Sequence, residues 1–475
     1  MSDDLDVSGG VGGIEAHYAS MLRYATVLDD AGDVLLEANG TLLGLTTDGD
    51  LAEATLMCPV EVGGIESSLV AATVGPDSAL WAAGEFEVLA RFLRGAVDAY
   101  RWVDDTQAFL QDFGQDAAGF AFGLALPGLA LGGGLLYATR PELRALLDQL
   151  GLTDPATLTE LLYDNPWLAE ALTRAAPGMV QGTAFSIAGL LGPFGPPLLT
   201  LLSGGNWPAG DYESAISGLI ALAGLGGAFQ DTGDFTVAPV EGSAVDIDFA
   251  ADSMLTQVFE QQRLVGADHG QIQIVQIDRG PGLPPSYIVQ IPGTQDWSPT
   301  RTDNPIDLTS NVQLMAGNST VSQEQIAEAM RQAGIGRDNP VMLTGHSQGG
   351  ITAASMAANP AFQDEFDIDS VVTGGSPIGR FDLPDDVSVM SLEHQQDVVP
   401  MLDGTNNPDR QNWVTVRRDL GDEAGDVGAA HGTDLYSRTG SLVDSSTDPS
   451  IAAWREANAQ FVGTGHATRY QIGPG

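Results

Sequence analysis

The chain has 475 residues, of which 63 are acidic and 19 are basic, and its formal net charge is −44. This length leaves room for two to three domains. So acidic a surface repels phosphate backbones, and it excludes nucleic acid as an expected partner. Hydrophobic residues make up 43% of the chain and charged residues 17%, which argues against disorder throughout.

The single cysteine, Cys58, excludes an intrachain disulfide and a thiolate metal cluster, and we expect it to be a small buried residue. No group of histidines and carboxylates has metal-ligand spacing, so we expect no metal and no cofactor. The acidic N-terminus lacks the basic-then-apolar layout of a Sec signal peptide. Export by a non-Sec route, membrane association and a cytoplasmic location all stay open.

Residues 1–113 are expected to form a helical hairpin or a small bundle. Apolar residues recur at helical spacing over residues 14–36 and again over 77–105. Glycine and proline lie between the two segments, as in the connection of a helical hairpin. This part of the chain is therefore predicted to be all-α.

Residues 114–235 are apolar and rich in glycine and proline. The stretch 117–139 is uncharged and long enough for a bilayer, which needs about 20 residues, but it contains Pro127 and six glycines. Proline and glycine are costly inside soluble helices and tolerated in membranes. Buried helices interrupted by loops and a segment that docks on or inserts into lipid both stay open. The runs that could associate with a membrane are 117–139 and 175–230.

Residues 236–475 alternate predicted strands and helices. A helix beginning at Ser322, with Gln325 three residues later, has the pattern of a capping box. Alternation of this kind predicts an α/β domain with a mostly parallel sheet and flanking helices. The predicted strands are 272–277, 287–291, 341–344, 370–373, 387–392 and 413–417.

The sequence Gly-His-Ser-Gln-Gly, from Gly345 to Gly349, has the context of a nucleophile elbow. A predicted strand precedes it and an alanine-rich helix, 351–358, follows. The two glycines leave space for a sharp turn, and the helix start offers free N–H groups and a positive dipole end. We therefore expect Ser347 to be a nucleophile. The alternative is a tight turn with a capping serine.

A serine nucleophile needs a base, and the base needs an orienting acid. In this type of sheet the acid and then the histidine follow the serine, each on a loop after a later strand. Asp397 and His431 hold these positions, with Asp403 and His466 as the respective alternatives. We place His466 beyond a helix in a glycine-rich tail. His394 lies too close to the acid in sequence and is interpreted as a structural neighbour.

An oxyanion hole needs two N–H donors. The first is expected from Gln348, directly after the nucleophile. The second is expected from Thr294, because the predicted strand 287–291 ends in Pro292-Gly293 and glycine lets the backbone approach a substrate closely. The alternative for this loop is a plain Pro-Gly turn.

The stretch 287–436 resembles the lipases of the α/β-hydrolase superfamily, specifically the fungal-type class 3 lipases. It departs from that family where Pro292 replaces the usual arginine and where the Ser-Pro block is one residue short. The resemblance implies an α/β-hydrolase domain in residues 236–475, a Ser347–Asp397–His431 triad and a lipid or other hydrophobic ester as substrate. The blocks that carry it are Gly293-Thr294 with Asp296-Trp297, Gly345–Gly350, Gly375–Gly379, Asp397–Pro400, and His431 with Tyr436.

The N-terminal helices also resemble the helical-hairpin substrates of type VII secretion, because Tyr100 and Asp104 match their Tyr-x-x-x-Asp/Glu signal. The expected function is serine-dependent hydrolysis of carboxylic esters by a lipase or esterase. An alternative is an exported or membrane-docking effector whose hydrolase domain is a phospholipase-like warhead. A third is a soluble intracellular esterase or thioesterase with an N-terminal cap.

Overall fold

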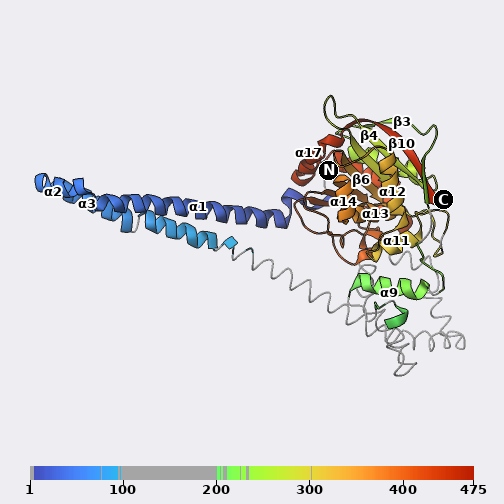
Figure 1. Cartoon of the computed structure of the whole chain (residues 1–475), viewed down its shortest axis with the longest axis horizontal. Helices are drawn as coiled ribbons and strands as arrows, with labels where there is room; N and C mark the ends of the chain where they lie inside the picture. Colours follow the sequence, from blue (N-terminus) through green and yellow to red (C-terminus); the bar gives the residue numbers. More distant parts are fainter. Residues whose placement is uncertain are drawn as a thin grey trace, which may run out of the picture. The chain divides into compact units, whose positions relative to one another are not determined.

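The computed structural model describes residues 5–75, most of 78–97 and, apart from short gaps, 200–474 (Figure 1). The chain divides into two compact units, one made of Met1–Gly13 with Gln111–Gly475 and the other of Ile14–Leu110. The first holds the sheet and the second is helical. This division differs from the expected helical region 1–113, because residues 5–9 form a strand of the sheet. The sequence does not predict this strand, because its apolar-polar alternation covers only five residues in an acidic segment.

The helical unit contains α1 (Ile14–Thr46), α2 (Gly49–Met57), α3 (Pro59–Val74) and further helical residues at 79–91. The first predicted helix is therefore present and longer than expected. Asp48 caps α2 by accepting a hydrogen bond from the Asp50 N–H. An ion pair between Arg94 and Asp29 joins the last helical segment to α1.

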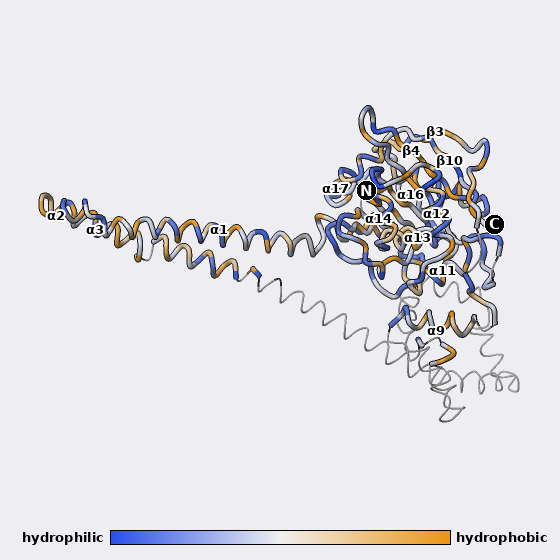
Figure 2. Tube along the Cα trace, viewed as in Figure 1, coloured by the Kyte–Doolittle hydropathy of each residue, from blue (hydrophilic) through white to orange (hydrophobic). Residues whose placement is uncertain are grey.

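Cys58 lies at the junction of α2 and α3 and is exposed, so its expected burial is wrong. Its neighbours Leu56, Met57 and Val60 are also exposed, at 88%, 84% and 82%. Figure 2 shows hydrophobic residues at the end of this unit where α2 meets α3. Among the described residues, no helix combines the length and apolar character that crossing a bilayer requires. The possible membrane segment 117–139 lies outside the described residues, as does most of 175–230.

The unit made of Met1–Gly13 and Gln111–Gly475 is built on a ten-stranded mixed sheet with a parallel centre. Strands β5 to β9 run parallel, and β1, β4, β10, β2 and β3 pair antiparallel around them. All six predicted strands are present. In sheet order the strands are β1 (Leu5–Gly9), β9 (Trp413–Arg418), β8 (Ser388–His394), β7 (Asp367–Gly374), β6 (Pro340–His346), β5 (Ser286–Ile291), β4 (Gln271–Ile277), β10 (Gly463–Pro474) and β2 (Phe235–Pro239), with β3 (Val245–Phe249) also paired to β10.

Helices cover both faces of this sheet, which makes the unit an α/β domain. All of β6 is buried, with Val341 and Leu343 in the core of one face and Met342 in the core of the other. Burial on both faces is typical of a central parallel strand. One face carries α12 (Val321–Gln332), α13 (Gln348–Ala358) and α14 (Pro360–Glu365), and the other carries α10 (Met254–Gly266), α16 (Thr433–Asp444) and α17 (Pro449–Ala457).

Further elements lie in the connections of the sheet unit. They are η1 (Gly10–Gly12), α9 (Tyr212–Gly224), α11 (Leu308–Met315), η3 (Val399–Asp403), η4 (Gly421–Glu423), α15 (Val427–Ala430) and η5 (Ala459–Phe461). The Tyr212 hydroxyl of α9 donates to the Leu402 carbonyl at 2.7 Å, so this helix packs on the segment after β8.

Two local expectations need correction. The capping box is formed by Thr320 and Gln323, each of which accepts from the other's backbone N–H, and not by Ser322 and Gln325. Both pairs fit the same pattern, and only the start of the helix separates them. His466 lies in β10, paired with β4 and β3, and not in a tail.

The net charge predicts that the stability of this protein increases with salt. Raising NaCl from 0.1 to 1 M shortens the screening length from about 10 to about 3 Å and so weakens repulsion among the carboxylates. We expect the Tm to rise by at least about 2–4 °C, the shift that 1 kcal/mol produces in a domain of this size. Thermal unfolding followed by circular dichroism measures it.

The variant Asp386→Asn tests the same repulsion among carboxylates at a single position. Burial, followed by repulsion from Asp367 and Asp386, raises the pKa of Asp369 to about 6. Removing one of these charges is expected to stabilise the protein in 0.1 M NaCl and to have less effect in 1 M. A Tm that does not change with NaCl for either protein contradicts the interpretation.

Candidate active site

Ser347 occupies a strained turn between β6 and α13. Its backbone has φ 56° and ψ −125°, and among the described residues only Phe229 is another non-glycine residue with positive φ. A side chain in this region costs about 1–3 kcal/mol, so the surrounding structure must impose the conformation. The turn has the strain expected of a nucleophile elbow.

Two glycines allow this turn to form. A Cβ on Gly345 would lie 2.0 Å from the carbonyl carbon of Gly349, and a Cβ on Gly349 would lie 2.0 Å from the Ile291 oxygen at the end of β5. No side chain fits at either position. The start of α13 therefore packs directly on the backbone of the neighbouring strand, as the motif predicts.

Asp397 and His431 come together from loops that follow β8 and β9. His431 Nδ1 lies 2.7 Å from Asp397 Oδ2, and the carboxylate is fully buried. The Tyr436 hydroxyl also donates to Oδ2, at 2.7 Å, and the Val399 N–H donates to Oδ1 at 2.9 Å. A carboxylate oxygen accepts, so Nδ1 donates to it and Nε2 is the ring nitrogen left to accept a proton.

The two alternative residues lie elsewhere. Asp403 accepts hydrogen bonds from the N–H groups of Gly379 and Thr405, and burial raises its pKa to about 7. His466 is exposed, and its Nδ1 lies 3.1 Å from Asp246. Neither residue has a hydrogen bond to Asp397 or His431 in the described part of the chain.

The Ser347 hydroxyl and the His431 ring have no hydrogen bond to each other among the described residues. Hydrogen bonds between a nucleophile and its base are often long without substrate and shorten when substrate binds. The absence of a Ser347–His431 hydrogen bond is therefore compatible with such a role. The two residues are nonetheless linked, because His346, next to the serine, lies 2.7 Å from the His431 carbonyl through its Nε2. The ring centroids of His346 and His431 are 4.5 Å apart.

Two buried histidines hold the loop that carries His431. A carbonyl can only accept, so His346 donates from Nε2 to His431, and His394 donates from Nδ1 to Ala430 at 2.7 Å. His394 also stacks on Tyr436 with 3.8 Å between ring centroids. Burial lowers the pKa of His346 to about 3 and that of His394 to about 4, so both rings are neutral at pH 7. The sequence indicated a structural neighbour of the acid at His394 and missed the carbonyl contacts of both rings, for which it carries no signal.

The two residues expected to form the oxyanion hole flank the Ser347 turn. Gln348 is the first residue of α13, where an N–H has no partner within the helix. Thr294 follows β5, and the Asn311 side chain donates to its hydroxyl at 3.2 Å, which holds the loop. A Cβ on Gly293 would lie 3.2 Å from the Ser347 Cβ, so this loop contacts the serine directly.

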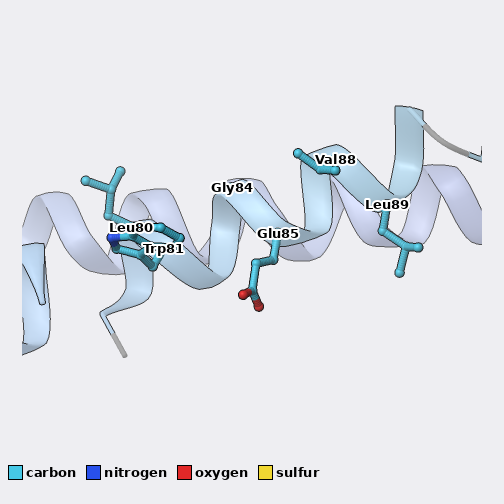
Figure 3. A pocket seen from close by; sticks show the side chains of 6 residues that line it. All are labelled: Leu80, Trp81, Gly84, Glu85, Val88 and Leu89. Atoms are coloured by element: carbon cyan, nitrogen blue, oxygen red, sulfur yellow. The ribbon is translucent and has the colours of Figure 1, made fainter. Parts of the chain in front are cut away.

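A separate hollow of about 660 Å³ lies along the helical residues 80–89 (Figure 3). Glu85 is the one ionisable residue among those that line it, and none of them is a serine, cysteine or histidine. Among the described residues that line it, this hollow therefore has no serine or cysteine beside a histidine. Its lining residues are Leu80, Trp81, Gly84, Glu85, Val88 and Leu89.

Within the described part of the chain, no group of three or more His, Cys, Asp and Glu side chains could hold a metal ion. Comparisons of the whole chain with protein-family models, curated proteins and solved structures yield no match. The case for a function therefore depends on the geometry around Ser347.

Gly349→Ala tests the packing of the elbow. The added Cβ would meet the Ile291 carbonyl, so the backbone must shift, and we expect the free energy of unfolding to fall by about 1–3 kcal/mol. Urea unfolding followed by tryptophan fluorescence measures it. Gly336→Ala is the control, because a Cβ there meets open space. Equal stability of Gly349→Ala and the wild type would show that α13 is not packed on β5.

His394→Gln tests the buried neutral histidine. The pKa of His394 is about 4 in the folded protein and about 6.5 when unfolded, so the unfolded chain binds more protons between these values. His394 therefore lowers the free energy of unfolding of the wild type as the pH falls from 6.5 towards 4. The variant is expected to be less stable than the wild type at pH 7.5, and this difference should shrink by roughly 1–2 kcal/mol at pH 5.

Urea unfolding at the two pH values measures the difference. Ser441→Ala, at an exposed and non-titrating position of α16, is the control. A difference that stays constant or grows at pH 5 would contradict a neutral His394.

Proposed function

We propose that the chain is a serine hydrolase of carboxylic esters, built on an α/β-hydrolase domain. The observation that carries the proposal is that the Ser347 elbow and the hydrogen-bonded Asp397–His431 pair follow strands of one parallel set. Because β6, β8 and β9 are parallel, their carboxyl ends meet at the same edge of the sheet. The direct contact between His346 and His431 supports the same arrangement.

In the proposed reaction the Ser347 oxygen attacks the ester carbonyl carbon, and His431 Nε2 takes the hydroxyl proton. The carbonyl electron pair moves to oxygen, where the N–H groups of Gln348 and Thr294 stabilise the charge. The intermediate collapses, the bond to the alcohol oxygen breaks, and His431 returns the proton to that oxygen. Water, activated in the same way, then releases the acid and restores Ser347.

Each supporting residue has a role in this scheme. Asp397 holds His431 in the tautomer whose Nε2 accepts a proton, and it stabilises the imidazolium that forms. The Tyr436 hydroxyl donates to the same Asp397 oxygen, Oδ2, and this second hydrogen bond limits how the carboxylate can rotate. The backbone strain at Ser347 fixes the position of its hydroxyl on the turn between β6 and α13.

The acyl half of the substrate is proposed from the resemblance of residues 287–436 to class 3 lipases, which favours a lipid or another hydrophobic acyl group. The effector alternative depends on membrane docking by residues 117–139 and 175–230, which lie mostly outside the described residues. Hydrolysis is therefore the function for which the described residues offer the most support.

Ser347→Ala and Asp397→Asn test the proposal with p-nitrophenyl esters of increasing acyl length. We expect Ser347→Ala to lose ester hydrolysis, and Asp397→Asn to lower kcat by about 10⁴-fold, because the histidine would hold the wrong tautomer. Ser441→Ala is the control serine and should retain activity. Retention of activity by Ser347→Ala, or no hydrolysis of any ester by the folded wild type, would overturn the proposal.

A further inference from the structure

A cavity of about 460 Å³ lies beside the proposed active site. It is lined by the end of α10, the loop after β5, His346 and Thr433 at the start of α16. This volume falls in the range of small-molecule sites. The cavity borders the proposed oxyanion loop, and it lies near His431, because Thr433 is two residues after His431 and the ring centroids of His346 and His431 are 4.5 Å apart.

Its walls are polar. The side chains that line it include Gln262, Arg263, His269 and Thr433, whereas the apolar contribution comes from Ala267 and two glycines. Among the described residues that line it, none is a leucine, isoleucine, valine, methionine, phenylalanine, tyrosine or tryptophan. A hydrocarbon chain placed here would gain little from leaving water, because it would find few apolar partners. The cavity is therefore unsuited to the acyl chain of a lipid.

The charge of the cavity is balanced. Arg263 is its one arginine, and that guanidinium lies 3.3 Å from Glu260 and 3.4 Å from Asp434. These two carboxylates offset its positive charge, in a chain whose net charge is already −44. Among the described lining residues, a phosphate or carboxylate group would therefore find no arginine that is not already paired, which favours an uncharged ligand.

Two hydrogen-bond acceptors in the walls have no donor among the described residues. Gln262 is 2% exposed, and its Nε2 donates to the carbonyl and the hydroxyl of Thr344, both at 2.9 Å. These bonds fix the amide so that Oε1 is the atom left without a partner. His346 donates from Nε2 to His431, so its Nδ1 is a second acceptor. A buried acceptor without a donor costs about 1–3 kcal/mol, which a donating ligand would recover.

We infer that this cavity binds the alcohol half of the ester, and that the preferred alcohol is uncharged and carries several hydroxyl groups, as in glycerol or a sugar. The inference rests on the proposed hydrolase function. Hydroxyl groups donate to Gln262 Oε1 and His346 Nδ1, which an apolar alcohol leaves unpaired. The position next to His431 suits the alcohol half, because His431 returns the proton to the leaving oxygen.

Glycerol 1-acetate and propyl acetate test the inference, since they share the acyl group and the three-carbon alcohol and differ in two hydroxyl groups. We expect the wild type to hydrolyse glycerol 1-acetate with a kcat/KM at least about tenfold higher, because a site with buried polar groups discriminates against a ligand that leaves them unpaired. Gln262→Met removes the Oε1 acceptor and should reduce this ratio towards one. Ala267→Trp fills the cavity from an exposed position and should do the same if Gln262→Met does not fold.

Leu264→Trp, on an exposed residue of α10 that does not line the cavity, is the matched control and should keep the wild-type ratio. p-Nitrophenyl acetate reports separately on the hydrolase. If the wild type hydrolyses it but shows equal kcat/KM for the two esters, or prefers propyl acetate, the inference is overturned and the proposed function stands. If folded wild type hydrolyses none of the three esters, the proposed function fails and the inference fails with it.

Discussion

The close packing of α13 on the end of β5 is the constraint on which the rest of the site depends. Gly349 lies against the Ile291 carbonyl, and Gly345 lies against Gly349, with no room for a side chain at either glycine. This packing forces positive φ on Ser347 and sets the first N–H of α13 beside it. The same contact brings the loop of Gly293 against the serine. One steric constraint thus positions the proposed nucleophile and both proposed oxyanion donors.

The other half of the site depends on buried polar groups around Asp397. The Asp397 carboxylate is fully buried, and its oxygens accept from His431, Tyr436 and a backbone N–H. The loop that carries His431 is held at two consecutive carbonyls by His394 and His346. Because both rings are buried and neutral, they can hold these carbonyls without adding a charge beside the carboxylate.

The two halves of the expected substrate place different demands on the protein. A resemblance in sequence pointed to a hydrophobic ester, whereas the cavity next to His431 is polar and leaves Gln262 Oε1 unpaired. An acyl ester of a hydroxyl-bearing alcohol satisfies both, because only its acyl half is apolar. The acidic surface is consistent with an uncharged alcohol, since it repels anions.

The sequence by itself predicted the six strands, the sharp turn at Ser347, and Asp397 and His431 as a pair on the loops after later strands. Alternation, turn residues and chain order are local signals, and parallel strands place the loops after them at one edge. Only the tertiary structure decided that residues 5–9 join the sheet, that His466 lies within a strand and that the cavity is polar. These outcomes depend on partners distant in sequence, such as the pairing of β1 with β9 and of β10 with β4. No local pattern specifies such partners, because a short alternating segment can pair with any free edge.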